Sequence, residues 1–254
     1  MDLLLRAQAL FPVLKALKDD LHRHPELSGR EVRTTALLKQ KLSALPVELV
    51  DLGVPTGTAA LLRGGRPGPL VALRADIDAI VQDTPERGAV VSEHPGVMHA
   101  CGHDFHTAGL YGAAVLLSEL QDTLPGGVIF LFQPSEETTG GARLLLDHGL
   151  WARFPEKPRW IFGVHNRPQL PAGTIAVTPG PLMAEKSNFT ITLHGRTGHG
   201  GSPHRCVDVI VPAAAIVQGI QSVVSRNTDP TDCLVCAVCS IHAGTPENFA
   251  PDLL

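Results

Sequence analysis

Residues 127–137 read Gly-Val-Ile-Phe-Leu-Phe-Gln-Pro-Ser-Glu-Glu, an apolar run that ends at two adjacent carboxylates. A short, continuous apolar run of this kind is typical of a buried strand. Ligand sites in open α/β sheets lie outside the carboxyl ends of the strands. The stretch therefore predicts a strand that delivers Glu136 and Glu137 to a functional sheet edge.

Other apolar segments also run directly into residues with reactive side chains. Residues 70–73 lead to Asp76, and residues 160–164 lead to His165. The remaining elements expected in this part of the chain are a strand over 59–62 and helices over 30–44, 106–120 and 1–20, the last kinked or restarted at Pro12. Alternating strands and helices predict an α/β layer architecture.

A second stretch, residues 98–104, reads Met-His-Ala-Cys-Gly-His-Asp and predicts a metal site. Cys101 and His103 are two residues apart, so in an extended turn both side chains can point at one spot. A thiolate and an imidazole that converge in this way suit a borderline-soft divalent cation. We expect this stretch, the Glu136–Glu137 pair and His165 to meet at one edge of the sheet. For each residue taken alone, a buried structural cysteine or histidine is the simpler interpretation.

Around residues 179–184, proline and glycine interrupt the alternation of predicted strands and helices. The elements expected beyond this point are a strand over 189–193, a helix over 207–225 and a strand over 234–241. This β-α-β unit predicts a second, smaller domain. We therefore expect one domain over residues 1–182 and another over 183–254.

Composition limits the classes of protein to which the chain can belong. A length of 254 residues allows one large or two modest domains. A net charge of −4 without a basic run argues against nucleic acid or an anionic membrane as a partner. No apolar run approaches membrane-spanning length, and the N-terminal residues fit an amphipathic helix better than a signal peptide. Five cysteines, one of them in the metal motif, favour a reducing cytoplasm.

The chain resembles the M20 family of metallo-amidohydrolases, in the branch that contains N-acyl-amino-acid, hippurate and auxin-conjugate hydrolases and N-acetyldiaminopimelate deacetylases. The matching motifs follow family order over nearly the whole chain: His-Arg-His-Pro-Glu-Leu at 22–27, Leu-Arg-Ala-Asp-Ile-Asp-Ala at 73–79, the Cys101/His103 stretch, residues 133–137, His165, residues 195–208 and Ser-Arg-Asn-Thr-Asp-Pro at 225–230. The resemblance implies a mixed-sheet α/β metallo-hydrolase domain with an inserted ferredoxin-like α+β lid, through which the protein forms a homodimer.

The resemblance also implies two divalent cations side by side in a complete site. Cys101 takes the place of the bridging ligand, and the terminal ligands are His103, Glu137 and His165. Bound divalent metals lower the pKa of water and polarise a carbonyl, which amide hydrolysis at neutral pH requires. The motifs do not distinguish Zn, Mn, Co and Ni.

Carboxylates at the sheet edge receive catalytic roles from the same resemblance. Glu136 is the general base, which takes a proton from the attacking water and returns it to the leaving amine. Asp76 orients ligand imidazoles and raises their basicity. Asp78 is the weaker candidate for such a role, with a strand-end cap as the alternative.

In the second domain, the resemblance points to a glycine-rich loop over 195–201 that contains His199. The matching histidine of relatives reaches the active site of the other subunit and stabilises the tetrahedral oxyanion, where a donor or a cation is needed. His204 and Asn248 are expected to contact the substrate. We interpret the loop as a flexible turn, because the strand–glycine–helix context of a phosphate loop does not accompany it.

The end of the sequence leads to a further expectation. Residues 248–252 read Asn-Phe-Ala-Pro-Asp and resemble a stretch inside the lid of family members, and two leucines follow. Family members continue from there for about a domain's worth of residues, which include a final metal-binding histidine. Both domains are therefore expected to be incomplete at the C-terminus.

The resemblance predicts an enzyme that hydrolyses the amide bond of a small N-acyl amino acid and releases a carboxylate and a free amino acid. The motifs do not specify the acyl group or the amino acid. The alternative within the family is an N-acetyldiaminopimelate deacetylase or a peptidase with the same mechanism.

Two alternatives belong to other classes of protein. A truncated, non-catalytic paralogue would bind ligands or dimerise through the lid. A metal-storage or redox protein would use Cys233, Cys236 and Cys239, which form a Cys-x-x-Cys-x-x-Cys run. Because Leu, Val and Ala fill the run and Cys236 would face away from the other two cysteines on a strand, we interpret it as an apolar strand.

Overall fold

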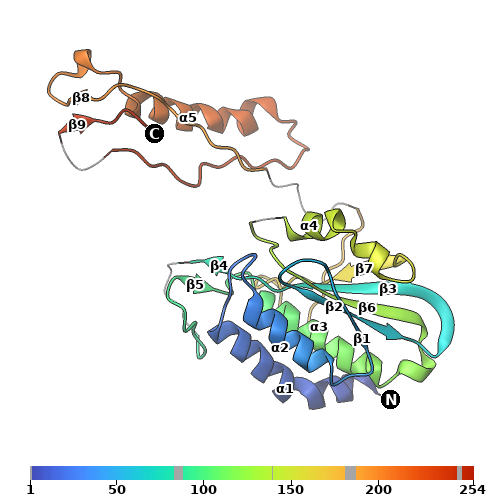
Figure 1. The fold of residues 1–254 in the computed structure, drawn as a ribbon. Coiled ribbons are helices and arrows are strands. Elements are labelled where there is room, and N and C mark those ends of the chain that lie inside the picture. The colour runs from blue at the N-terminus through green and yellow to red at the C-terminus, as the bar shows by residue number, and fades with distance from the viewer. Residues whose placement is uncertain (1, 83–87, 139, 181–186, 245–247) are drawn as a thin grey trace. The chain divides into compact units, whose positions relative to one another are not determined.

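The computed structural model describes residues 2–82, 88–138, 140–180, 187–244 and 248–254 (Figure 1). The chain separates into two compact units, Met1–Pro171 and Ala172–Leu254, which are called unit 1 and unit 2 below. The expected domain boundary between residues 182 and 183 lies outside the described residues.

Unit 1 is built on a five-stranded sheet with the strand order β1-β2-β6-β3-β7. Its strands are β1 (Glu48–Val50), β2 (Thr58–Arg63), β3 (Arg66–Asp76), β6 (Pro125–Gln133) and β7 (Trp160–Gly163). β1, β2 and β6 pair antiparallel, whereas β6, β3 and β7 pair in parallel. The mixed sheet confirms the expected α/β class, and the carboxyl ends of its parallel strands meet at one edge.

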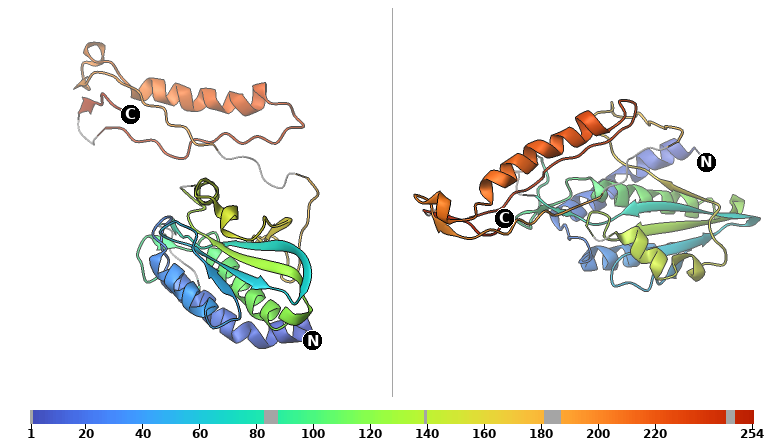
Figure 2. Two further views of the ribbon diagram at one scale, coloured as in Figure 1. Left: turned by 45° about the vertical axis from the view of Figure 1, so that its right-hand side comes forward. Right: turned by 90° about the horizontal axis from the view of Figure 1, so that it is seen from above.

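Helices cover both faces of this sheet, as Figures 1 and 2 show. On one face lie α1 (Leu3–Arg23), α2 (Val32–Leu42) and α3 (His103–Ser118), and on the other lie α4 (Gly141–Asp147) and the 3₁₀ turn η2 (Leu150–Arg153). A second 3₁₀ turn, η1 (Gln121–Thr123), precedes β6. The sheet is therefore the middle layer of a three-layer arrangement.

The apolar run of β6 is buried on both of its faces. Phe130 and Phe132 pack in a core with α2 and α3, whereas Ile129 and Leu131 pack in a second core with α4 and η2. Successive side chains of a strand point to opposite faces, so a strand covered on both sides carries a continuous apolar run. This explains why the sequence of β6 predicts its position well.

Some element boundaries differ from those expected. α1 continues through Pro12 to Arg23 without interruption. α3 begins at His103, earlier than expected, so the extended turn predicted for Cys101 to His103 is wrong, and the stretch is a junction between a loop and a helix. The short strands β1, β4 (Ile80–Val81) and β5 (Val97–Met98) were not predicted, because two or three residues are too few to show a period.

The described part of unit 2 contains α5 (Ile210–Asn227), the 3₁₀ turn η3 (Pro203–Arg205) and the antiparallel pair of β8 (Gly198–His199) and β9 (Phe249–Ala250). α5 confirms the expected helix, but the strands expected over 189–193 and 234–241 are wrong. A strand needs a hydrogen-bonded neighbour. Among the described residues, only Leu193 of these two segments has a backbone partner, which is Leu254.

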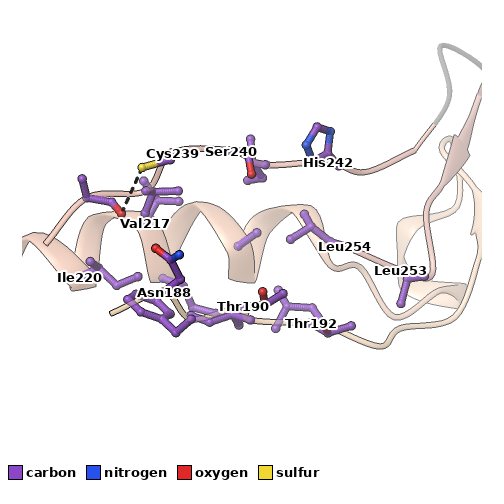
Figure 3. Close-up of a pocket in the computed structure, with 18 of the residues that line it drawn as sticks. Asn188, Thr190, Thr192, Val217, Ile220, Cys239, Ser240, His242, Leu253 and Leu254 are labelled. Carbon is purple, nitrogen blue, oxygen red and sulfur yellow. Dashed lines mark hydrogen bonds between the residues drawn. The ribbon is translucent and has the colours of Figure 1, made fainter. Parts of the chain in front are cut away.

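Instead of forming a sheet, the two segments and α5 line an apolar groove of about 590 Å³ (Figure 3). Val217 and Ile220 of α5 face the groove, and Cys239 contributes from the segment opposite. All predicted site residues lie in the described part of the chain, and none of them lines this groove.

Two observations concern the chain as a whole. None of the described helices is both long and apolar enough to cross a bilayer. The cysteines at positions 101, 206, 233, 236 and 239 are all described and all carry free thiols.

Candidate metal centre

The parallel strands of unit 1 place several predicted site residues at one sheet edge. β3 ends at Asp76, which lies opposite Gln133 at the end of β6. The chain continues from β6 to Glu136 and Glu137 and from β7 to His165. These residues therefore leave the sheet at the position where open α/β sheets assemble ligand sites.

The beginning of α3 brings a thiol and an imidazole to the same edge. Potential ligand atoms of Cys101, His103 and Glu137 all lie within 4.8 Å of one another. Gly102 separates the first two residues and has a φ of 79°, which is in the left-handed region that favours glycine. This conformation turns the chain between Cys101 and α3, so that both side chains face Glu137. We call Cys101, His103 and Glu137 the metal cluster.

Asp78 orients the imidazole of the metal cluster. Nδ1 of His103 lies 2.8 Å from the carbonyl oxygen of Asp78 and 3.2 Å from its carboxylate. Nε2 is then directed at the cluster, 3.8 Å from Oε1 of Glu137. Burial lowers the pKa of His103, but the hydrogen bond to Asp78 and the charge of Asp76 outweigh burial and raise it. Sequence reasoning ranked Asp78 below Asp76, yet Asp78 is the residue that forms hydrogen bonds with the cluster imidazole.

Two buried carboxylates hold the loop that carries the adjacent glutamates. Glu31 accepts a hydrogen bond from the amide of Ser135 at 2.8 Å, and Asp78 accepts one from the amide of Glu137 at 3.0 Å. Ser135 has a φ of 58°, which is uncommon and costly for a residue with a side chain, and such strained residues cluster at active sites and ligand sites. Sequence reasoning missed Glu31, because nothing in its immediate sequence distinguishes it from a solvated acidic residue.

Negative charge gathers around the thiol of Cys101. Burial, a hydrogen bond to Glu137 and the charges of Glu137 and Glu136 raise the pKa of Cys101 to about 12. A divalent cation would reverse this effect, because a coordinating thiol loses its proton. The sulfur, nitrogen and oxygen donors also match a borderline-soft cation. The residues present therefore fit a metal ion.

Asp76 contacts an imidazole outside the predicted ligand set. Its Oδ1 lies 2.6 Å from Nδ1 of His106, and Arg74 donates to its other oxygen at 2.8 Å. Burial raises the pKa of Asp76, but the His106 hydrogen bond and the Arg74 charge outweigh burial and lower it to about 2. Sequence reasoning missed His106, although its spacing of three from His103 would place both on one side of a helix.

His165 lies beside these imidazoles at an exposed position. Its ring centroid is 4.7 Å from that of His106 and 6.5 Å from that of His103. Its Nδ1 lies 2.8 Å from the carbonyl oxygen of Asn166. The ring is therefore next to the metal cluster without being part of it.

The remaining predicted residues lie in unit 2. His199 is in β8 and exposed, and its Nδ1 accepts the amide of Gly201 at 3.0 Å. Asn248 lies close to this loop, because its carbonyl oxygen accepts the amide of Gly200 at 2.7 Å. His204 is exposed on η3. The structure thus brings His199 and Asn248 together within unit 2.

Comparison with known proteins identifies the family of this chain. A family model described as peptidase family M20/M25/M40 matches residues 72–245, which is more than half of the chain. The chain belongs to the M20 family. The expected family membership is thereby confirmed.

Relatives of the M20 chain are longer than the chain itself. It is 43% identical over 237 residues to N-acetylcysteine deacetylase of Bacillus subtilis and 38% identical over 239 residues to N-acyl-L-amino acid amidohydrolase of Geobacillus stearothermophilus. These alignments cover 93% of the M20 chain but 61% and 63% of the relatives. The chain therefore spans about three fifths of the length of these proteins.

Solved structures show the same likeness. A Bacillus subtilis protein described as a dinuclear metal-binding peptidase from the M20 family matches with a TM-score of 0.69 and 37% identity, over 97% of the M20 chain and 62% of that protein. An aminobenzoyl-glutamate utilization protein from Klebsiella pneumoniae matches with a TM-score of 0.62 and 21% identity, over 100% and 67%. The second match concerns the fold alone.

Proposed function

We propose that this M20 chain hydrolyses the amide bond of an N-acyl amino acid and releases a carboxylate and a free amino acid. The observation that carries the proposal is the convergence of Cys101, His103 and Glu137 at the sheet edge, with the exposed carboxylate of Glu136 beside them. The names of relatives that are 38% to 43% identical support it, because they are deacetylases and amidohydrolases of N-acyl amino acids.

The residues that would hold two cations are Cys101, His103, Glu137 and His165. Bound divalent cations would supply a water of lowered pKa and a polarised carbonyl. The number of ions is supported by the related Bacillus subtilis structure, which is described as a dinuclear metal-binding peptidase. The donor set accommodates Zn, Mn, Co or Ni.

Glu136 is the general base in this proposal. Residue Glu136 is exposed, whereas the adjacent Glu137 is partly buried in the metal cluster. Loss of some hydration beside the protein surface and the charge of Glu137 raise the pKa of Glu136. A carboxylate with a raised pKa accepts a proton from the attacking water more readily and can pass it to the leaving amine.

Unit 2 contains the proposed lid, and we propose residues 1–182 as the catalytic domain and 183–254 as a lid through which two chains dimerise. Because Nδ1 of His199 accepts an amide, a neutral ring carries its proton on Nε2. That N–H would stabilise the oxyanion in the site of the other subunit. His204 and Asn248 would contact the substrate.

The substrate is proposed at the level of a class, a small N-acyl amino acid. N-acetyldiaminopimelate deacetylases are among the relatives, at 38% identity, and so are carboxypeptidases, at 37%. We keep both as alternatives that would use the same carboxylates and ligands of this chain. A cytoplasmic location belongs to the same proposal and is supported by the free thiols of all five cysteines.

The test is amino-acid release from a panel of N-acetyl- and N-benzoyl-amino acids with added Mn²⁺, Co²⁺ or Zn²⁺ and a chelated control. We expect metal-dependent release, and a loss of about 100- to 10,000-fold in Glu136→Gln with metal binding retained. Glu48→Gln, in the exposed ion pair between Glu48 of β1 and Arg63 of β2, is the matched control and should keep full activity. No release from a folded, metal-loaded chain would contradict the proposal, and full release by Glu136→Gln would remove Glu136 as the base.

A further inference from the structure

Both ring nitrogens of His106 have defined partners. Nδ1 lies 2.6 Å from Oδ1 of Asp76, and the backbone amide of Asn166 donates to Nε2 at 3.0 Å. His106 and Asp76 are buried, and Arg74 donates to the second carboxylate oxygen. The imidazole therefore joins the end of β3 to the segment after β7.

These partners determine where the proton of His106 lies. A backbone amide can only donate a hydrogen bond, so Nε2 of His106 must present its lone pair. The proton is then on Nδ1, where it is donated to the Asp76 carboxylate. The amide of Asn166 therefore fixes Nε2 as the acceptor of the ring and Nδ1 as its donor.

Asn166 connects this hydrogen bond to the metal cluster. A Cβ added to Gly102 would lie 2.5 Å from Oδ1 of Asn166, so the asparagine side chain packs directly over the turn between Cys101 and His103. His165 is the preceding residue, and its ring lies 4.7 Å from that of His106. Movement of the segment at 165–166 would therefore move His165 relative to Cys101 and His103.

We propose that His106 is a positioning residue, which holds the segment of His165 and Asn166 against the turn of Cys101 and His103 by accepting the amide of Asn166 while donating to Asp76. This inference deepens the proposed function and rests on it, because it assigns His165 to the same cation site. We call the three-residue connection of Asp76, His106 and Asn166 the clamp.

The hydrogen bonds of the clamp also show whether His106 is a metal ligand or a positioning residue. Potential ligand atoms of Asp76, His103 and His106 lie within 4.8 Å of one another, which by distance alone would suit a metal ion. However, Nε2 of His106 faces an N–H donor and Nδ1 carries a proton, so neither nitrogen offers a lone pair to a cation. His106 acts through His165 and is not a ligand.

The first test needs no metal. Long-range ¹H–¹⁵N correlation spectra of the metal-free chain, with His106 assigned by comparison with His106→Gln, report which ring nitrogen carries the proton. We expect the Nδ1–H tautomer. The Nε2–H tautomer or an imidazolium at neutral pH would overturn the clamp, whether or not the chain binds metal.

The second test measures Co²⁺ affinity by competition with a chelator. Gln can place an oxygen near the position of Nε2 and accept the Asn166 amide, whereas Asn reproduces only the donor at Nδ1. We expect His106→Asn to lose about 10- to 100-fold in affinity, as for other residues behind metal ligands, with unchanged stoichiometry. His106→Gln should lose less. His148→Asn, at an exposed histidine after α4, is the control.

Comparing the Co²⁺ affinities of the single and double variants distinguishes a loss of the clamp from a general loss of structure. If His106 acts through His165, adding His106→Asn to His165→Ala should cost no further affinity. Additive losses, equal losses in His106→Asn and His106→Gln, or a lower Co²⁺ stoichiometry in His106→Asn would overturn the proposal. If the wild-type chain binds no Co²⁺ but shows the Nδ1–H tautomer, the proposed metal centre fails and the hydrogen bonds of the clamp stand.

Discussion

Cys101 shows how single residues set the chemistry of this site. Its thiol lies among Glu136, Glu137 and Asp76, and the pKa of Cys101 is raised to about 12. The thiol is therefore protonated at neutral pH until a cation replaces the proton. The same carboxylates that disfavour the bare thiolate favour the positive charge of a metal ion.

A pH dependence of metal binding follows from this thiol. Because the proton of Cys101 must leave when a cation binds, the apparent affinity should rise about tenfold for each pH unit between pH 6 and 8. Calorimetric titration with Zn²⁺ in buffers of different ionisation enthalpy measures the protons released. Cys206→Ala, at a cysteine of unit 2, should leave the slope unchanged, and a pH-independent affinity would contradict the protonated thiol.

At the scale of elements, the junction between the 98–102 loop and α3 positions both the thiol and the imidazole. Gly102 combines a φ of 79° with close contact to Asn166. Gly109 lies further along the same helix, is exposed, and has no atom within 4 Å of an added Cβ. Position 102, just before α3, therefore requires glycine, whereas position 109 inside α3 has room for a side chain.

We expect Gly102→Ala to destabilise the protein by about 1–3 kcal/mol, because alanine is strained at this φ and meets the Asn166 side chain. Gly109→Ala should stabilise it by about 0.5–1 kcal/mol through helix propensity. Urea unfolding of both variants measures the difference. Equal stability of Gly102→Ala and the wild-type protein would show that the junction tolerates a side chain.

The sequence was most informative for elements with a long, continuous signal. β6 and β7 were predicted because apolar runs lead into Glu136 and His165, and β3 because its run leads to Asp76. The start of α3 was misplaced because the left-handed turn at Gly102 is a tertiary feature, and His106 was missed with it. In unit 2, residues 189–193 alternate like a strand, but alternation alone does not supply a hydrogen-bonded neighbour.

At the scale of the whole molecule, the proposed chemistry needs both units and two chains. Unit 1 holds the metal cluster and Glu136, whereas His199 belongs to unit 2. If His199 serves the site of the other subunit, each active site is built from two chains. Such a site can be reconstituted from two variants that are each inactive.

We expect a mixture of Glu136→Gln and His199→Ala chains to recover about a quarter of wild-type activity after subunit exchange, because half of the dimers are mixed and each has one intact site. Amide hydrolysis by the separate and mixed variants measures the recovery. Mixing Glu136→Gln with Glu136→Gln/His199→Ala is the control and should recover nothing. If His199 acts within its own chain, the first mixture stays inactive as well.

The central claim, that Cys101, His103 and Glu137 form a metal centre, is tested most directly by titrating the metal-free chain with Co²⁺ and recording its absorption spectrum. The account predicts a thiolate-to-cobalt charge-transfer band that saturates with metal, is absent in Cys101→Ser and is retained in Cys206→Ser. Absence of this band from the wild-type spectrum, or its persistence in Cys101→Ser, would contradict the proposed metal centre.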